Sequence, residues 1–195
     1  MYILGVCYNT DASACLFKNG KLISAISEER LNRKKSWFGV PHRSIEMLLK
    51  MNNLNINDIK FIACHGLTNR RVNQKRYEEV ESLINKSKLT NNKKSTQLFY
   101  LKERSVREQN VYKNRIPNYL KELKKYKIPL KIFSHHHCHA ASAFYPARKK
   151  DGFIITIDGW GEDGLSATLW SIKNFKIKML SQSGILDSLG YFYGS

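Results

Sequence analysis

Cysteines are few in this sequence, and no two of them stand close together. The four cysteines lie at positions 7, 15, 64 and 138 and form no Cys-x-x-Cys pair, so we interpret them as reduced thiols of a cytoplasmic protein. Long apolar runs are also missing, because no stretch approaches the roughly 18 residues that a membrane-spanning helix needs. Residues 1–14 lack the basic start of an export signal. We therefore expect no export, no membrane span and no membrane partner.

Acidic residues are scarce relative to basic ones. The chain has 33 lysines and arginines against 16 aspartates and glutamates, which gives a formal net charge of +17. The imbalance concentrates in residues 70–127, which hold 17 lysines and arginines, 6 glutamates, and neither aspartate nor glycine. Such a block can attract nucleic acid, so a basic nucleic-acid-binding module is one alternative function. The segment lacks a binding motif with interleaved exposed aromatic residues, so we favour the solvated surface of long helices and do not expect nucleic acid as a partner.

Strands and helices alternate along the predicted structure. Apolar and alternating runs predict strands at 2–9, 13–18, 21–28, 59–64, 130–133, 153–157, 165–170 and 175–180. Helices are expected over 41–51, over 71–127 with a break at 89–92, and from the histidine-rich segment to just before Pro146. Asn19-Gly20 predicts a tight hairpin, because both residues tolerate positive φ.

Two stretches of the sequence echo each other. Residues 13–17 (SACLF) and 166–170 (SATLW) each follow an apolar strand and a turn that contains aspartate. A three-stranded meander therefore begins at residue 2 and again near residue 153. Followed by alternating helices and strands, this meander predicts an α/β fold of the actin-like ATPase or ribonuclease-H-like kind. We expect a first lobe over 1–150, with a basic helical insertion at about 70–127, and the opening strands of a second, similar lobe over 151–195.

The turns after the first strand of each predicted lobe are candidate nucleotide-binding sites. In lobes of this kind, such turns present backbone N–H groups to phosphates. The second turn holds three glycines, which let the backbone approach a ligand closely. The candidate cofactor-binding residues are Asn9, Thr10, Ala12, Gly159, Gly161 and Gly164.

Four of the six histidines lie within positions 135–139. On a helix, His135 and His139 share one face at a spacing that lets two imidazoles hold one metal ion. Asp158 follows a buried strand and precedes a glycine, so its carboxylate can project into the same site. Two histidines and one aspartate suit iron, zinc or manganese. The alternative is a histidine cluster that holds no ligand. His136 and His137 would point elsewhere and could bind a phosphate or a partner.

These residues also carry a resemblance to a known family. Residues 135–145 (HHHCHAASAFY) and 157–162 (IDGWGE) resemble the HHxxHAASAFY…DGxGE pattern of O-carbamoyltransferases of the NodU/CmcH type. Further matching pieces are DASA at 11–14, EER at 28–30 with Arg33, Lys35 and Pro41, and SLGYFY at 188–193. The chain departs from the pattern at Thr10 and Ser36, where the family usually has histidine.

The resemblance implies a function as the N-terminal part of a carbamoyltransferase. A carbamoyl group from carbamoyl phosphate and ATP would pass, as carbamoyl adenylate, to a hydroxyl of a sugar or natural product, with metal assistance. His135, His139 and Asp158 would be metal ligands, Lys35 a cation near the transferred group, and Asp11 a second catalytic residue. The rest of the second lobe and the adenylate-forming domain would come from beyond Ser195 or from another chain, so we expect no complete turnover from this chain alone. A lobe of an actin-like sugar kinase or ATPase is the other alternative.

Overall fold

The computed structural model describes residues 1–8, 10–66, 71–110, 114, 116–159, 161, 164–184 and 188–189. For residues 71–76, 107 and 108 it describes the backbone alone. Contacts divide the chain into two compact units, of which unit 1 holds residues 1–65 and 114–133 and unit 2 holds residues 66–113 and 134–195. This division does not test the predicted lobe boundary at residue 150, which stays a prediction.

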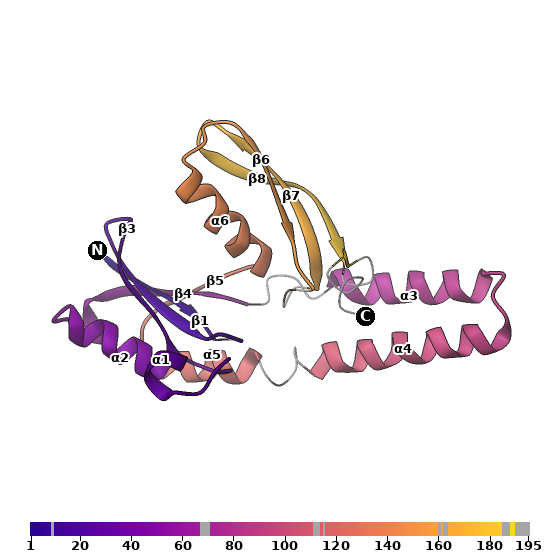
Figure 1. Ribbon diagram of the computed structural model, residues 1–195, viewed down its shortest axis with the longest axis horizontal. Helices are drawn as coiled ribbons and strands as arrows, with labels where there is room; N and C mark the ends of the chain where they lie inside the picture. Colours follow the sequence, from indigo (N-terminus) through magenta and orange to yellow (C-terminus); the bar gives the residue numbers. More distant parts are fainter. Residues whose placement is uncertain are drawn as a thin grey trace. The chain divides into compact units, whose positions relative to one another are not determined.

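Unit 1 is built on a five-stranded mixed sheet (Figure 1). Its elements are β1 (Tyr2–Cys7), β2 (Ser13–Lys18), β3 (Lys21–Ser27), α1 (Glu28–Asn32), α2 (His42–Met51), the 3-10 turn η1 (Ile56–Asp58), β4 (Ile59–His65), α5 (Ile116–Lys124) and β5 (Leu130–Phe133). The strand order is β3-β2-β1-β4-β5. The first three strands form an antiparallel meander, and β4 and β5 continue the sheet parallel to β1.

The core of unit 1 follows from alternation along β1. Leu4 and Val6 point to one face of the sheet, where Ile45 and Leu48 of α2 and Leu123 of α5 join them in one buried cluster. The hairpin between β2 and β3 turns at Asn19 and Gly20, whose φ angles of 50° and 79° confirm the predicted tight turn.

Unit 2 contains a three-stranded antiparallel sheet and a helical hairpin (Figure 1). Its elements are α3 (Arg71–Lys86), α4 (Asn91–Asn110), α6 (His135–Ala147), β6 (Gly152–Ile157), β7 (Leu165–Lys173) and β8 (Lys176–Gly184). The strand order is β6-β7-β8, which is the second meander that the sequence predicts. One face of this sheet packs against α6, where Ala140 and Phe144 meet Ile154, Trp170 and Ile172.

The structure confirms the predicted α/β class and the predicted strands to within a few residues. One helix end differs from the prediction. Pro146 lies inside α6 instead of beyond it, and the helix ends where the Arg148 N–H donates to the Phe144 carbonyl. A proline so near the C-terminus removes one hydrogen bond of the last turn and leaves the preceding turns intact. In the described part of the chain, no helix is long and apolar enough to cross a membrane.

Candidate metal centre

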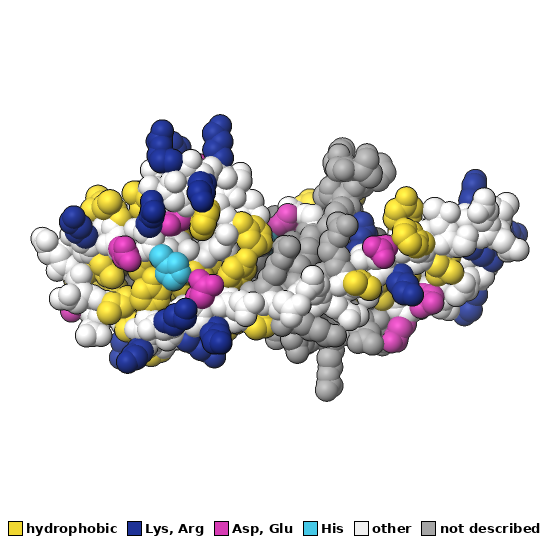
Figure 2. Space-filling model, turned by 90° about the horizontal axis from the view of Figure 1, so that it is seen from below, with side chains coloured by type: hydrophobic (Ala, Val, Ile, Leu, Met, Phe, Trp, Pro, Cys, Tyr) yellow, Lys and Arg dark blue, Asp and Glu magenta, His cyan; other side chains and the backbone are white. Residues whose placement is uncertain are grey.

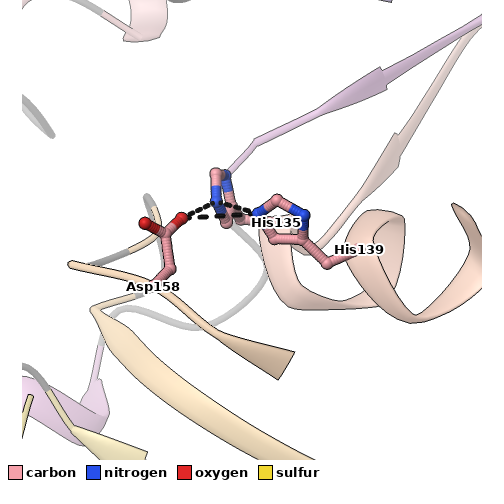
Figure 3. Close-up of side chains that lie close together, drawn as sticks. All are labelled: His135, His139 and Asp158. Atoms are coloured by element: carbon pink, nitrogen blue, oxygen red, sulfur yellow. Dashed lines mark hydrogen bonds and ion pairs between the residues drawn. The ribbon is translucent and has the colours of Figure 1, made fainter. Parts of the chain in front are cut away.

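The histidine-rich segment begins helix α6. Ser134 precedes the helix, and its hydroxyl accepts a hydrogen bond from the His137 N–H at 3.2 Å, which caps the first turn. His135 and His139 therefore lie one turn apart, and both imidazoles project from the same face toward the end of β6 (Figure 3). In the next turn, Ala140 is fully buried against the sheet, whereas Ser142 and Ala143 are exposed.

Asp158 stands directly after β6, and its backbone is held on both sides. Its N–H donates to the Ser166 carbonyl at 2.8 Å, and the Ser188 hydroxyl donates to the carbonyls of residues 158 and 159 at 3.1 and 2.8 Å. The Gly159 N–H donates to Asp158 Oδ1 at 2.6 Å, which leaves Oδ2 turned toward the two imidazoles. The carboxylate is thus oriented by backbone groups of its own turn.

Three ligand atoms converge between α6 and this turn. His135 Nε2 lies 2.7 Å from Asp158 Oδ2, His139 Nε2 lies 3.3 Å from the same oxygen, and the two Nε2 atoms are 2.9 Å apart. Hydrogen bonds from His135 and then His139 hold the pKa of Asp158 well below its usual range, against the opposing effect of burial. Among the described residues, His135, His139 and Asp158 form a group of side chains that could share one metal ion.

The spacing of these atoms fits a divalent metal ion. Adjacent donors of a six-coordinate ion with bonds of about 2.1 Å lie about 3.0 Å apart, whereas tetrahedral donors at that bond length lie about 3.4 Å apart. The three observed separations of 2.7, 2.9 and 3.3 Å lie on both sides of the first value. Two imidazoles and one carboxylate on one face of an ion are the donor set of iron and manganese sites that keep open positions.

Four N–H groups of the predicted phosphate-binding turns donate to other groups of the chain in this structure. The Gly159 N–H donates to Asp158, and those of Gly161 and Gly164 donate to the carbonyls of Leu165 and Gly161 at 2.8 and 2.9 Å. In the other turn, the Ala12 N–H donates to the Trp37 carbonyl at 3.1 Å. To bind a phosphate, these N–H groups would have to give up their present hydrogen bonds within the chain. Phosphate binding by the two turns stays a prediction.

The remaining predicted site residues lie on the surface of unit 1. Thr10 and Asp11 are exposed in the turn after β1, and Asn9 falls outside the described residues. Lys35 is exposed in the loop after α1, next to Ser36, whose N–H donates to the Glu29 carboxylate at 3.0 Å. The bond between Ala12 and Trp37 joins this loop to the turn of Asp11, so the two candidate catalytic residues belong to neighbouring loops of one unit.

The prediction for His136 is wrong. Its side chain is completely buried and bonded to the sheet, so it is available neither to a phosphate nor to a partner. The sequence does contain the signal for this position, because His136, Ala140 and Phe144 follow one another at intervals of four and form the buried stripe of α6. When the histidines are considered only for the spacing of metal ligands, the place of His136 in this buried stripe is overlooked.

The α3–α4 hairpin gives little support to a nucleic-acid surface. Between residues 77 and 106, where side chains are described, it has 6 lysines and arginines and 4 glutamates. On the face shown in Figure 2, hydrophobic, acidic and basic side chains of the hairpin are intermixed. The described basic side chains of the hairpin do not gather into one stripe on that face.

The fold and the site together define a mixed α/β protein with a candidate mononuclear metal centre. The chain belongs to the carbamoyltransferase N-terminus family, whose model matches residues 2–195. It is 26% identical to an uncharacterized protein of Methanocaldococcus jannaschii over 99% of this chain and 29% of that protein. It is 28% identical to the nodulation protein NolNO of Sinorhizobium fredii over 94% of this chain and 24% of that protein. The chain thus spans less than a third of the length of these curated relatives.

A solved structure of YeaZ from Pseudomonas aeruginosa also resembles this chain. It has a TM-score of 0.44 at 12% sequence identity and covers 94% of this chain and 66% of that one. A likeness of this strength assigns neither fold nor function.

Proposed function

We propose that this chain is the metal-binding part of a carbamoyltransferase that modifies a hydroxyl group of a sugar or natural product. Family membership supports carbamoyl transfer. The observation that carries the metal role is the convergence of His135, His139 and Asp158 on one point. We further propose that the two meanders belong to two actin-like lobes and that ATP and carbamoyl phosphate supply the carbamoyl group as an adenylate.

The proposed transfer balances as a substitution at the carbamoyl carbon. A bond forms from the acceptor oxygen to that carbon, the bond from the carbon to the phosphate oxygen of the adenylate breaks, AMP leaves, and the hydroxyl proton passes to solvent. A bound divalent ion would supply Lewis acidity, which polarises the carbamoyl carbonyl or lowers the pKa of the acceptor hydroxyl.

The residues of this chain contribute a preorganised donor set. His135 and His139 present Nε2 toward one point, and Asp158 supplies a negative charge there, since its depressed pKa keeps it ionised at neutral pH. The Gly159 N–H fixes the rotation of that carboxylate. Asp11 and Lys35 stay candidates for the catalytic roles that the resemblance implies. We also place the protein in the cytoplasm, a proposal that rests on the wide spacing of the four cysteines in the sequence.

Metal analysis of protein purified without a histidine tag tests this proposal. We expect one equivalent of iron or manganese per wild-type chain, and loss of that metal in His139→Ala and Asp158→Asn. His137→Ala is the matched control, because it removes a neighbouring imidazole of α6 that is not among the three converging groups. A wild-type chain that binds no divalent metal would contradict the metal role and favour the ATPase-lobe alternative.

Turnover is tested separately. In an assay with ATP, carbamoyl phosphate and added metal, we expect no carbamoylated product from the 195-residue chain alone, because it spans only 29% and 24% of two curated relatives. Efficient product formation by this chain would refute that expectation.

A further inference from the structure

His136 is completely buried between two ligands of the candidate metal centre, and both of its ring nitrogens are bonded. Nε2 lies 2.8 Å from the Leu165 carbonyl, which can only accept, so this nitrogen carries a proton and donates. Nδ1 lies 2.7 Å from the hydroxyl of Thr156. The imidazole thus joins the first turn of α6 to the end of β6 and the start of β7.

The bonds around His136 form one directed chain. The Trp170 indole N–H donates to the Thr168 hydroxyl at 2.6 Å, and that hydroxyl lies 2.6 Å from the Thr156 hydroxyl. If Thr168 donates to Thr156 and Thr156 donates to His136 Nδ1, each N–H and O–H of this series of hydrogen bonds donates to one acceptor. A protonated Nδ1 would reverse these bonds and leave the Thr168 hydroxyl without its acceptor in the chain. The arrangement therefore selects the tautomer that carries its proton on Nε2 and accepts a hydrogen bond at Nδ1.

The two backbone segments that hold His136 also hold Asp158. Thr156 lies in β6, and Asp158 follows two residues later, directly after the end of that strand. Leu165 adjoins Ser166, whose carbonyl accepts the Asp158 N–H at 2.8 Å. A shift of α6 relative to Asp158 would therefore have to break bonds of His136.

We propose that His136 is a positioning residue of the metal centre, which sets the depth and rotation of α6 so that His135 and His139 meet Asp158. This inference rests on the proposed metal-binding function. Metal sites tolerate about 0.2 Å of error in ligand distances, so a small displacement of the helix spoils the site. Groups that orient ligands from outside the coordination shell typically contribute 10–100-fold to metal affinity.

Titration of the metal-free chain with Co²⁺ tests the role of His136. In His136→Gln, the amide N–H can still reach Leu165, but the bond to Thr156 is lost. Thr156→Val removes the same bond from the other side with little change in volume. We expect both variants to bind Co²⁺ about 10–100-fold more weakly than the wild type and to alter the visible spectrum of the bound ion, which reports the number and arrangement of ligands.

A packing control separates positioning from stability. Ile172→Val weakens the contact of the sheet with α6 without touching a hydrogen bond of the chain, and we expect it to lower the melting temperature but leave Co²⁺ affinity within about 2-fold of wild type. Unchanged affinity and spectrum in folded Thr156→Val would overturn the inference while the metal role stands. So would nitrogen-15 shifts that place the His136 proton on Nδ1 instead of Nε2. A wild-type chain that binds no Co²⁺ would overturn both proposals.

Discussion

Glu28 is a buried carboxylate whose removal should cost unit 1 much of its stability. Its side chain is 3% exposed and lies at the N-terminus of α2. It accepts the Ser44 N–H at 2.8 Å, the Ser44 hydroxyl at 2.7 Å and the Arg43 N–H at 3.2 Å. Pro41, the residue before the helix, provides no side-chain cap. A glutamate from a distant helix therefore satisfies the first turn of α2.

The cost of Glu28→Ala can be worked from these bonds. Ser44 is fully buried, so water cannot replace the carboxylate at its N–H and hydroxyl. Each buried polar group that is left unsatisfied costs about 1–3 kcal/mol, whereas the partly exposed Arg43 N–H can bond to water. We therefore expect a loss of about 3 kcal/mol, a large part of the 5–15 kcal/mol that stabilises a typical domain. Glu28→Gln keeps one acceptor oxygen and should cost about 1 kcal/mol.

The neighbouring glutamate provides the control. The Glu29 carboxylate accepts a hydrogen bond from the Ser36 N–H on the surface, so Glu29→Ala should cost less than about 1 kcal/mol. Urea unfolding followed by circular dichroism measures the differences, and amide hydrogen exchange of the α2 peptide locates them. If Glu28→Ala unfolds at the same urea concentration as Glu29→Ala, the buried-cap argument fails.

Two further predictions concern a half-buried phenol and an exposed sheet face. Burial, and after it the charge of nearby glutamates, raises the pKa of Tyr126 to about 12, above an unfolded value of about 10. The contribution of the neutral phenol to the free energy of unfolding is therefore present below about pH 10 and lost between about pH 10 and 12. Raising the pH from 9 to 11 should accordingly lower the urea midpoint more for wild type than for Tyr126→Phe. On β6, Phe153, Ile155 and Ile157 are 71%, 67% and 57% exposed, so the isolated chain should self-associate. Light scattering should show that Ile155→Lys reduces this association more than Phe99→Lys on α4 does, and equal effects would argue against the β6 face.

Local sequence signals predict much of this fold because they act over a few residues. Alternation defines the strands, and two residues that tolerate positive φ define the hairpin at Asn19 and Gly20. The spacing of His135 and His139 and the place of Asp158 after a buried strand predict one shared site, and in the structure the three ligand atoms lie within 4.8 Å of one another. The strand alternation, the hairpin residues and the histidine spacing each lie within a short stretch of chain.

Other features depend on contacts that no local pattern encodes. The partner of Glu28 is a helix that begins 14 residues later, and nothing in the motif at 28–30 distinguishes a cap from a catalytic group. The partners of His136 come from two strands that follow α6. The N–H groups of Gly159, Gly161 and Gly164 donate within the chain, although a glycine-rich sequence alone suggests that they are open to a ligand.

The two meanders show how one strand pattern can bury opposite faces. The pairing of β1 with β2 sets Leu4 opposite Leu16, and the pairing of β6 with β7 sets Ile155 opposite Leu169 at the equivalent place in the sequence echo. Leu4 is fully buried in unit 1, whereas Ile155 is 67% exposed in unit 2.

The other face of each meander shows the reverse pattern of burial. Trp170 and Thr168 are buried under α6, whereas the equivalent Phe17 and Cys15 are only partly covered. In unit 2, the buried face of the sheet is therefore the one that carries the hydrogen bonds to His136, next to the candidate metal centre. The apolar side chains on the other face of β6 are as suited to a core as those of β1, so their exposure follows from what packs against the sheet and not from the strand sequence.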